Sequence, residues 1–305
     1  MEGRILRGAQ VNRLSVFQQA IGLFVTTFPN HSNAISVARL RYVQAVCETG
    51  VHRNPDTLVG HFLPLPLRLL SLLQAKKLRH PFYYLLLART KHYDQLFTEA
   101  VLDDTTTIIN IGCGLDTRAL RFATQLKTRN KAVFECDQAH LIFKKEILAK
   151  RKWCVDHIQY LSIDLNDDFT WMQLFSRLAK IDGALLVLLE GVSPYIAESS
   201  FSGFLKSIAE IAPLGSRIAY DALIRGKVDL SGPERLFRLS AVKEEIIAFH
   251  EAMGYRVGHI EFGPELAGRL LPNLGPKCTS LFADNCTIVL TVGRGPARMR
   301  LVGAC

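Results

Sequence analysis

From Thr105 onward the sequence alternates short apolar, β-rich runs with segments of helical spacing, and this alternation constrains the fold more than any other feature. The runs are 106–111, 131–137, 158–163, 184–189 and 216–221. Near-continuous apolar strands of this kind are typical of a parallel sheet covered on both faces, with the helices as right-handed crossovers. The sequence therefore predicts a doubly wound, Rossmann-like α/β fold with a mostly parallel sheet.

The residues before and after these five runs also have recognisable patterns. Apolar residues recur with helical spacing across 32–48, 62–73 and 83–100, so residues 1–104 are predicted to form a helical N-terminal segment. Two late runs, 255–262 and 285–292, have strand character and are predicted to close the sheet as an antiparallel edge hairpin. Because the sequence has no internal repeat or polar linker, residues 105–305 are predicted as one core domain.

Composition and charge narrow the functional classes. A chain of 305 residues with 49% hydrophobic and 21% charged residues can bury a full core. The formal net charge is +9, but without a block of five or more like charges, so no nucleic-acid partner is expected. The most apolar runs are too short or too interrupted to span a bilayer, and no secretory signal is recognised. We expect a cytoplasmic protein without a membrane partner.

The seven cysteines have no pattern typical of a disulfide framework or a zinc site, because no two of them form a C-x-x-C pair. Reduced thiols and no bound metal are expected. The cysteines are Cys47, Cys113, Cys136, Cys154, Cys278, Cys286 and Cys305.

A glycine-rich turn, Gly112-Cys113-Gly114, lies between the first predicted strand and the helix that follows it. Glycine permits a positive φ and a close approach of a ligand to the backbone, and the free amides of the helix favour an anionic group. A plain strand-to-helix connection can have the same form. The third glycine of a dinucleotide-binding G-x-G-x-x-G motif is absent, since Thr117 occupies its place.

Acidic residues close the next two predicted strands. Glu135 and Asp137 lie on the same side of the second strand, where a carboxylate can accept hydrogen bonds from ribose hydroxyls. Asp164 ends the third strand and suits an adenine amino group. The alternatives are a helix N-cap for the first two and a turn-forming aspartate for Asp164.

A series of motifs occurs in order over residues 36–221: A-R-T, I-N-I-G-C-G-L-D-T-R-A-L-R-F, F-E-C-D-Q, I-D-L and L-L-E-G-V-S-P-Y-I. Together they resemble the leucine carboxyl methyltransferase family, which includes bacterial polyketide O-methyltransferases. The resemblance implies a class I methyltransferase that uses S-adenosylmethionine. Cys113 departs from the pattern, because the family usually has alanine there.

The resemblance also implies roles for single residues. Arg89 of A-R-T would pair with the methionine carboxylate of the cofactor, and Gly112 and Gly114 would wrap the same moiety. The other implied cofactor contacts are Asp116 in the turn motif, Asp137 at the ribose, Asp164 and Leu165 at the adenine, Glu190 beside the amino group or sulfonium, and Arg53 as part of the cover. The alternatives are a helix-surface ion pair for Arg89 and a solvent-exposed strand end for Glu190.

The acceptor is less defined. Tyr195 is the candidate catalytic residue, and the alternative is that it forms only a wall of the pocket. A carboxylate acceptor needs no base, whereas a hydroxyl could lose its proton to a His or Tyr, and the sequence leaves both open. The N-terminal helices are predicted to form a lid whose aromatic residues cover the acceptor. These residues are Tyr42, His52, His61, Phe62, Tyr83 and Tyr84.

The predicted function is transfer of a methyl group to an oxygen, either carboxylate or hydroxyl, of a small-molecule or peptide acceptor in secondary metabolism. Two alternatives are a non-catalytic Rossmann-like binding protein and a dinucleotide-dependent oxidoreductase. The absent third glycine argues against the oxidoreductase. The oligomeric state is not predicted.

Overall fold

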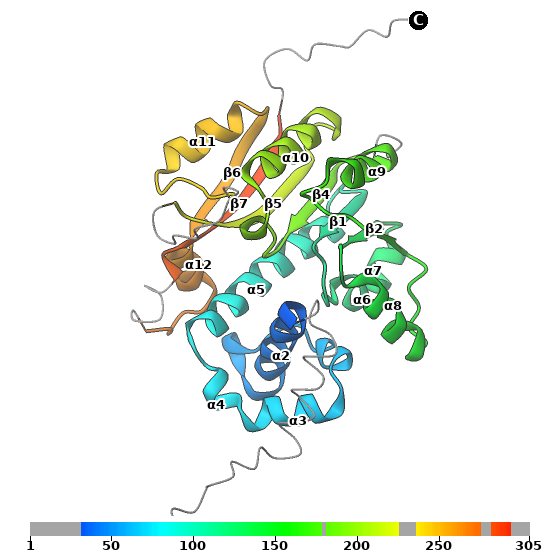
Figure 1. Cartoon of the computed structure of the whole chain (residues 1–305), viewed down its shortest axis with the longest axis vertical. Helices are drawn as coiled ribbons and strands as arrows, with labels where there is room; N and C mark the ends of the chain where they lie inside the picture. The colour runs from blue at the N-terminus through cyan, green and yellow to red at the C-terminus, as the bar shows by residue number, and fades with distance from the viewer. Residues whose placement is uncertain (1–31, 179–180, 226–235, 276–281, 294–305) are drawn as a thin grey trace, which may run out of the picture.

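The computed structural model describes residues 32–178, 181–225, 236–275 and 282–293, and these contain a seven-stranded sheet (Figure 1). The strand order is β3-β2-β1-β4-β5-β7-β6. The strands are β1 (Thr107–Ile111), β2 (Ala132–Cys136), β3 (Ile158–Leu161), β4 (Leu185–Leu189), β5 (Arg217–Leu223), β6 (Tyr255–Phe262) and β7 (Asn285–Val292).

The first five strands pair in parallel, and β7 pairs antiparallel with both β5 and β6. This confirms the doubly wound, mostly parallel sheet and its C-terminal antiparallel hairpin. The chain builds outward from β1 through β2 to β3 and then returns to place β4 on the other side of β1. In such sheets ligands bind outside the carboxyl ends of the strands at this switch in strand order.

Alternating strand residues enter two different cores, one on each face of the sheet. Leu186 and Leu188 of β4 pack with Tyr93 and Phe97 of α5 (Pro81–Leu102). Val187, between them, belongs to the core on the opposite face. The other helices of the α5 face are α6 (Arg118–Arg121) and α7 (Ala123–Thr128); those of the opposite face are α9 (Asp168–Leu178), α10 (Glu198–Ile211) and α11 (Lys243–Glu251). Full burial on both faces explains why β4 is continuously apolar.

The helices before α5 form a cluster next to this sheet (Figure 1). They are α2 (Ser32–Cys47), η2 (Gly50–His52), η3 (Val59–Phe62), α3 (Leu65–Leu73) and α4 (Ala75–Leu78). Ile35, Phe62 and Leu67 share a small core with Leu148 of α8 (Leu141–Lys150). The last of the helices, α12 (Gly263–Leu270), packs on α5. Residues 1–31 lie outside the described range, so the proposed division at residue 104 stays a prediction.

The structure also describes most of the cysteines. Cys47, Cys113, Cys136, Cys154 and Cys286 are free thiols. The remaining cysteines, 278 and 305, fall outside the described residues. Within the part of the chain that is described, no helix combines the length and the apolar character needed to cross a bilayer.

Candidate active site

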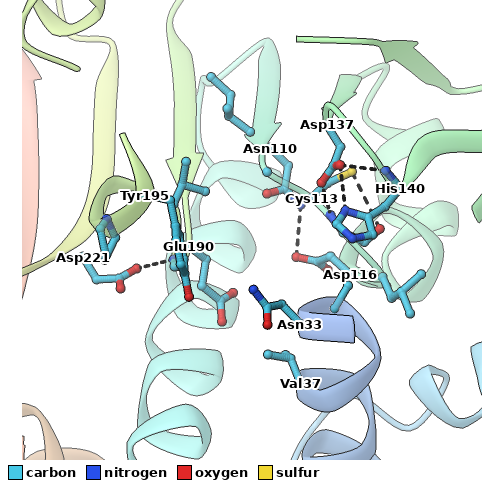
Figure 2. Close-up of a pocket in the computed structure, with 18 of the residues that line it drawn as sticks. Asn33, Val37, Asn110, Cys113, Asp116, Asp137, His140, Glu190, Tyr195 and Asp221 are labelled. Carbon is cyan, nitrogen blue, oxygen red and sulfur yellow. Dashed lines mark hydrogen bonds and ion pairs between the residues drawn. The ribbon is translucent and has the colours of Figure 1, made fainter. Parts of the chain in front are cut away.

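A cavity of about 630 Å³ opens at the carboxyl ends of the strands, beside the switch in strand order (Figure 2). Its volume lies within the usual range for ligand pockets. The turn after β1 and the loops after β2, β3 and β4 form one side. Helix α2, the start of α5, the end of β5 and the start of β7 complete the wall. The cavity therefore lies where the fold predicts a ligand site.

The β1–α6 turn adopts a conformation that requires glycine. Gly112 has φ +65° and Gly114 has φ +46°. A Cβ atom on Gly112 would lie 2.3 Å from Cγ2 of Val192, so a side chain there would collide with the loop after β4. The Gly114 amide donates to Oδ2 of Asp137 at 2.8 Å. This hydrogen bond ties the turn to the end of β2.

Asp137 is an ionised hydrogen-bond acceptor in the cavity wall. Its Oδ1 accepts hydrogen bonds from the backbone amides of Ala139 and His140 and contacts Nδ1 of the His140 ring at 2.8 Å. Burial alone would raise the pKa of Asp137, but the hydrogen bonds from His140 and Gly114 outweigh it and lower the pKa to about 2. Asp137 therefore holds the turn before α8 and also lines the cavity.

The other two acids at these strand ends differ in position. Glu135 is fully buried in an ion pair with Lys144, at 2.7 Å from Oε2 to Nζ, and it does not line the cavity. Asp164 and Leu165 do line it. Gln138 donates to Asp164 Oδ2 at 2.7 Å, which links the loops after β2 and β3. Of the pair Glu135 and Asp137, the structure thus brings only Asp137 to the site.

Three arginines from three different helices surround Glu190 at the end of β4. Its carboxylate lies 2.6 Å from Arg41 of α2, 2.8 Å from Arg118 of α6 and 3.4 Å from Arg89 of α5. Burial would raise the pKa of Glu190, but the three arginines lower it to about 2. Glu190 is therefore a buried, ionised residue rather than a solvent-exposed strand end.

Arg89 lies inside the cavity wall and not on the helix surface. Its guanidinium also contacts Asp221 at 3.3 Å and packs closely against Gly191, where a Cβ atom would lie 3.0 Å from Nη2. Asp221 accepts hydrogen bonds from the Gly191 amide and the Tyr93 hydroxyl. Burial acts to lower the pKa of Arg89, but Asp221 and Glu190 raise it, so the charge is retained.

Asp116 belongs to the same charged network. Its carboxylate accepts hydrogen bonds from the Asn110 side chain and the Arg118 amide, and it forms an ion pair with the Arg118 guanidinium. Burial opposes ionisation of Asp116, but Arg118 and Arg41 hold its pKa well below the usual range. Asp116 also lines the cavity.

Sequence reasoning missed several residues of the site. Arg41 and Asn33 reach the cavity from α2, and Figure 2 shows Asn33 between Glu190 and Asp116. No motif in the sequence distinguished these two from other polar residues of a helix. Asp221 did have a signal, because it stands near the end of a run that was recognised as a strand.

Some predicted residues lie elsewhere. Arg53 is not among the residues that line the cavity, and its Nε donates to the carbonyl oxygen of Ala45 at 3.1 Å. None of the six aromatic residues expected over the acceptor lines the cavity. The Tyr83 hydroxyl, for example, donates to Glu48, and the Tyr42 ring packs against Gly60. These aromatic side chains build the helical cluster itself.

Tyr195 does reach the cavity, from the short helix η4 (Ser193–Tyr195), and its residue surface is 64% exposed. The Ser193 hydroxyl donates to the backbone oxygen of Asp221 and fixes this loop to β5. The start of α5, the loop after β4 and the end of β5 also contribute apolar residues to the cavity lining, which we call the apolar wall: Phe82, Leu85, Val192, Pro194, Ile196 and Leu223.

The sequence profile of the leucine carboxyl methyltransferase family matches residues 68–209. This stretch contains Arg89, the glycine turn, Asp137 and Glu190. Relatives that match the chain are named as S-adenosylmethionine-dependent methyltransferases. Over this stretch the chain is similar to the leucine carboxyl methyltransferase family. The cofactor that these relatives' names give is S-adenosylmethionine.

Two of these relatives are bacterial proteins provisionally named S-adenosyl-L-methionine-dependent methyltransferases. The one from Saccharopolyspora erythraea is 31% identical over 152 residues, which are 48% of this chain and 50% of the relative. The one from Streptomyces coelicolor is 28% identical over 207 residues, which are 65% of this chain and 71% of the relative. The match thus spans about half the length of the first relative.

The fold is also found among solved structures. A Thermobifida fusca protein, provisionally named a methyltransferase, superposes with a TM-score of 0.53 at 14% identity, covering 85% of this chain and 94% of that protein. At this identity the likeness concerns the fold alone, which is that of Rossmann-like class I methyltransferases.

Proposed function

We propose that this protein is an S-adenosylmethionine-dependent methyltransferase that modifies an oxygen of a small-molecule or peptide acceptor. The observation that carries the proposal is that one cavity combines two sets of residues. One set is the charged and glycine-rich edge of β1 to β4, and the other is the apolar wall that ends at Tyr195. A group-transfer enzyme needs this combination, because cofactor and acceptor must meet in one space.

The cofactor residues of the family fit the observed chemistry. Gly112 and Gly114 both have a positive φ and line the cavity, so the backbone of the turn can lie close to a ligand. Asp137 is ionised and suits two ribose hydroxyls, while Asp164 and Leu165 suit the adenine. We propose that Arg89 binds the methionine carboxylate and that Glu190, with Asp116 nearby, faces the positively charged part of the cofactor.

S-adenosylmethionine, when bound, supplies a methyl carbon activated by its sulfonium. The protein then has to align the acceptor and exclude water. The apolar wall suits the exclusion of water. Asp221 and Asn285 are polar residues that also line the cavity. An acceptor carboxylate is already nucleophilic, whereas a hydroxyl has a candidate partner in Tyr195.

The acceptor class and its metabolic setting rest on the family resemblance. Because the family includes polyketide O-methyltransferases, we propose a product of secondary metabolism, methylated in the cytoplasm. Tyr195→Phe removes only the hydroxyl, and Tyr195→Ala removes the ring as well. Loss of transfer in both variants indicates a role for the hydroxyl, and loss in Tyr195→Ala alone indicates a wall.

Calorimetric titration of the full chain tests the cofactor assignment. We expect binding of S-adenosylmethionine and S-adenosylhomocysteine and no binding of NAD. Tight NAD binding without binding of the sulfonium compound would overturn the proposal. Transfer of a radiolabelled methyl group to panels of carboxylic acids and phenols then tests catalysis. Binding of the cofactor without transfer to any panel favours a non-catalytic binding protein.

A further inference from the structure

The positive formal charge of this protein is concentrated in the first 93 residues of its sequence. Residues 1–93 contain twelve Lys and Arg residues but three acidic ones, Glu2, Glu48 and Asp56. In residues 94–305 basic and acidic residues are equal in number. The first 93 residues therefore account for the whole formal net charge of +9. Arg41 and Arg89 are paired with Glu190 in the cavity wall, so the surface surplus has to come from other basic residues of this region. Exposed cations without acidic neighbours are typical of a surface that meets an anionic partner.

One helix of this region also exposes an apolar face. Leu65, Leu69 and Leu73 of α3 are spaced four residues apart and are 59%, 46% and 81% exposed. Four-residue spacing places the three side chains on one side of the helix. The opposite side packs on the cluster core through Leu67, and Ser71 is fully buried there. The exposed leucines are therefore not part of a core in the described structure.

Lysines follow these leucines directly. Helix α4 contains Lys76 and Lys77, both exposed, and no ion pair is recorded for either within the described ranges. The charge of nearby Arg79 is offset by Glu48, at 2.8 Å. No acidic residue occurs anywhere between Thr57 and Tyr93. We call Leu65, Leu69, Leu73, Lys76 and Lys77 the α3–α4 face. Its two charged residues are thus uncompensated cations.

We propose that the α3–α4 face docks this protein on an anionic membrane surface. In such a contact the leucines enter the interface between headgroups and acyl chains, while the lysines pair with anionic headgroups. Figure 1 shows α3 and α4 end to end at one edge of the molecule, with α2 between them and the sheet. A surface contact of this kind needs no membrane-spanning helix.

The combination of leucines and lysines favours a lipid surface over a protein partner. The exposed groups of the face are branched alkyl chains and flexible ammonium groups, which an acidic lipid layer accommodates without a matching shape. The α3–α4 face is close in sequence to residues of the cavity. Phe82 and Leu85 line the cavity from the start of α5, which follows α4 in the chain. An apolar acceptor dissolved in the membrane would suit this arrangement and the apolar cavity wall.

Vesicle flotation of the purified full chain tests the proposal. The probes are vesicles of phosphatidylcholine alone and of phosphatidylcholine mixed with phosphatidylglycerol. We expect the protein to float with the anionic vesicles, to remain behind with the neutral ones, and to dissociate as salt is added. A protein that binds neither kind of vesicle, or both equally well at all salt concentrations, would overturn the proposal.

Paired variants locate the contact. Lys76→Gln with Lys77→Gln should weaken binding to anionic vesicles about fivefold per lysine. The matched control, Lys150→Gln with Lys152→Gln at the end of α8, should bind like the parent. Leu69→Ser with Leu73→Ser should weaken binding by about tenfold or more. Its control is Ile142→Ser with Met172→Ser, because those residues are 76% and 59% exposed on other helices.

Other outcomes are informative as well. Vesicle binding that survives both α3–α4 pairs would place the contact elsewhere and overturn the proposal. A concentration-dependent dimer that disappears in the leucine pair, without vesicle binding, would identify a second copy of the chain as the occupant. Affinity for S-adenosylmethionine is measured in every variant, because retained affinity shows correct folding. The docking result is then separate from the test of the proposed activity.

Discussion

Two ionised side chains in the cavity wall should determine cofactor affinity. Arg89→Ala removes a buried guanidinium, and Asp137→Asn removes a buried carboxylate charge at nearly constant size. Each should weaken S-adenosylmethionine binding by about 1–3 kcal/mol, because charge-assisted hydrogen bonds are lost. Calorimetric titration measures the change. Unchanged affinity in both variants would show that the residue assignments are wrong.

Matched controls come from the same sequence. Arg53→Ala should leave cofactor affinity unchanged, because Arg53 donates to the Ala45 carbonyl outside the cavity. Asp167→Asn changes a carboxylate that accepts a hydrogen bond from the Phe169 amide at the start of α9. That variant should also bind the cofactor normally. A loss of affinity for S-adenosylmethionine in Arg53→Ala would indicate that Arg53 does contact the cofactor.

A buried histidine should make stability depend on pH. His250 is fully buried, with Nε2 at 2.6 Å from the Tyr220 hydroxyl and Nδ1 at 2.6 Å from the Ile246 carbonyl. Burial lowers its pKa from 6.5 to about 4, although the contact with Ile246 acts in the opposite direction. The folded state therefore favours the neutral ring. Its contribution is complete above the unfolded pKa and is lost as the pH falls from 6.5 towards 4.

The expected loss from His250 between pH 7 and pH 5 is about 2 kcal/mol. Urea unfolding of the parent protein and of His250→Gln at both pH values measures it, because glutamine does not titrate. The stability difference between the two proteins should shrink by that amount at pH 5. A difference that is the same at both pH values would contradict the shifted pKa of His250.

At the scale of elements, the β1–α6 turn and a helical glycine should respond in opposite ways to the same substitution. Gly112→Ala introduces a Cβ at a positive φ and at 2.3 Å from Val192, so it should cost more than about 1 kcal/mol of stability and weaken cofactor binding. Gly203→Ala lies within α10, where nothing is within 4 Å of the new atom. That control should stabilise by about 0.5–1 kcal/mol.

Urea unfolding and calorimetric titration measure both glycine variants. If Gly112→Ala unfolds and binds the cofactor as the parent does, the turn does not need the observed conformation. The opposite signs matter more than either magnitude, since both substitutions add one methyl group.

Elements with continuous burial were the most predictable from sequence. β4 is buried on both faces, so its apolar run marked it directly, and the structure starts and ends it within a residue of that run. The hairpin of β6 and β7 was also recognised, but its place next to β5 was not, because strand order depends on contacts between distant segments. The Gly112 turn was recognised because its conformation restricts the residue type locally.

The sequence predicted the helices of the cluster, but not which side of each helix faces the cavity. Helix α2 has apolar residues around most of its circumference, so the sequence does not indicate which side meets the sheet. Arg41 and Asn33 consequently remained unrecognised, and the aromatic residues were assigned to the wrong side of the cluster. The long-range ion pairs of Glu190 with Arg41 and Arg118 join positions 149 and 72 residues apart, which single-sequence periodicity does not relate.

At the scale of the whole molecule, one buried charge network joins the helical cluster to the sheet. Arg118, with 1% of its side chain exposed, contacts Asp94 of α5, Asp116 of the turn and Glu190, which directly follows β4. Glu190 also contacts Arg41 of α2. The segments on both sides of the cavity are therefore held by the same set of charges, so the cofactor site and the overall fold share their stabilising contacts.

Arg118→Met should reveal this dependence. The substitution removes the ion-pair partner of Asp116 and one of the partners of Asp94 and Glu190 in a low-dielectric interior, which costs about 3–5 kcal/mol of unfolding free energy. Arg217→Met is the matched control, because Arg217 also pairs with two acids, Glu99 and Asp103, but these are largely exposed. That change should cost at most about 1 kcal/mol.

Arg118→Met should also weaken cofactor binding, because Glu190 and Asp116 both lose their contact with Arg118. Arg217→Met should leave cofactor binding unchanged. Equal stability losses in the two variants would mean that Arg118 and its partners at the cavity contribute no more than an ordinary surface ion pair.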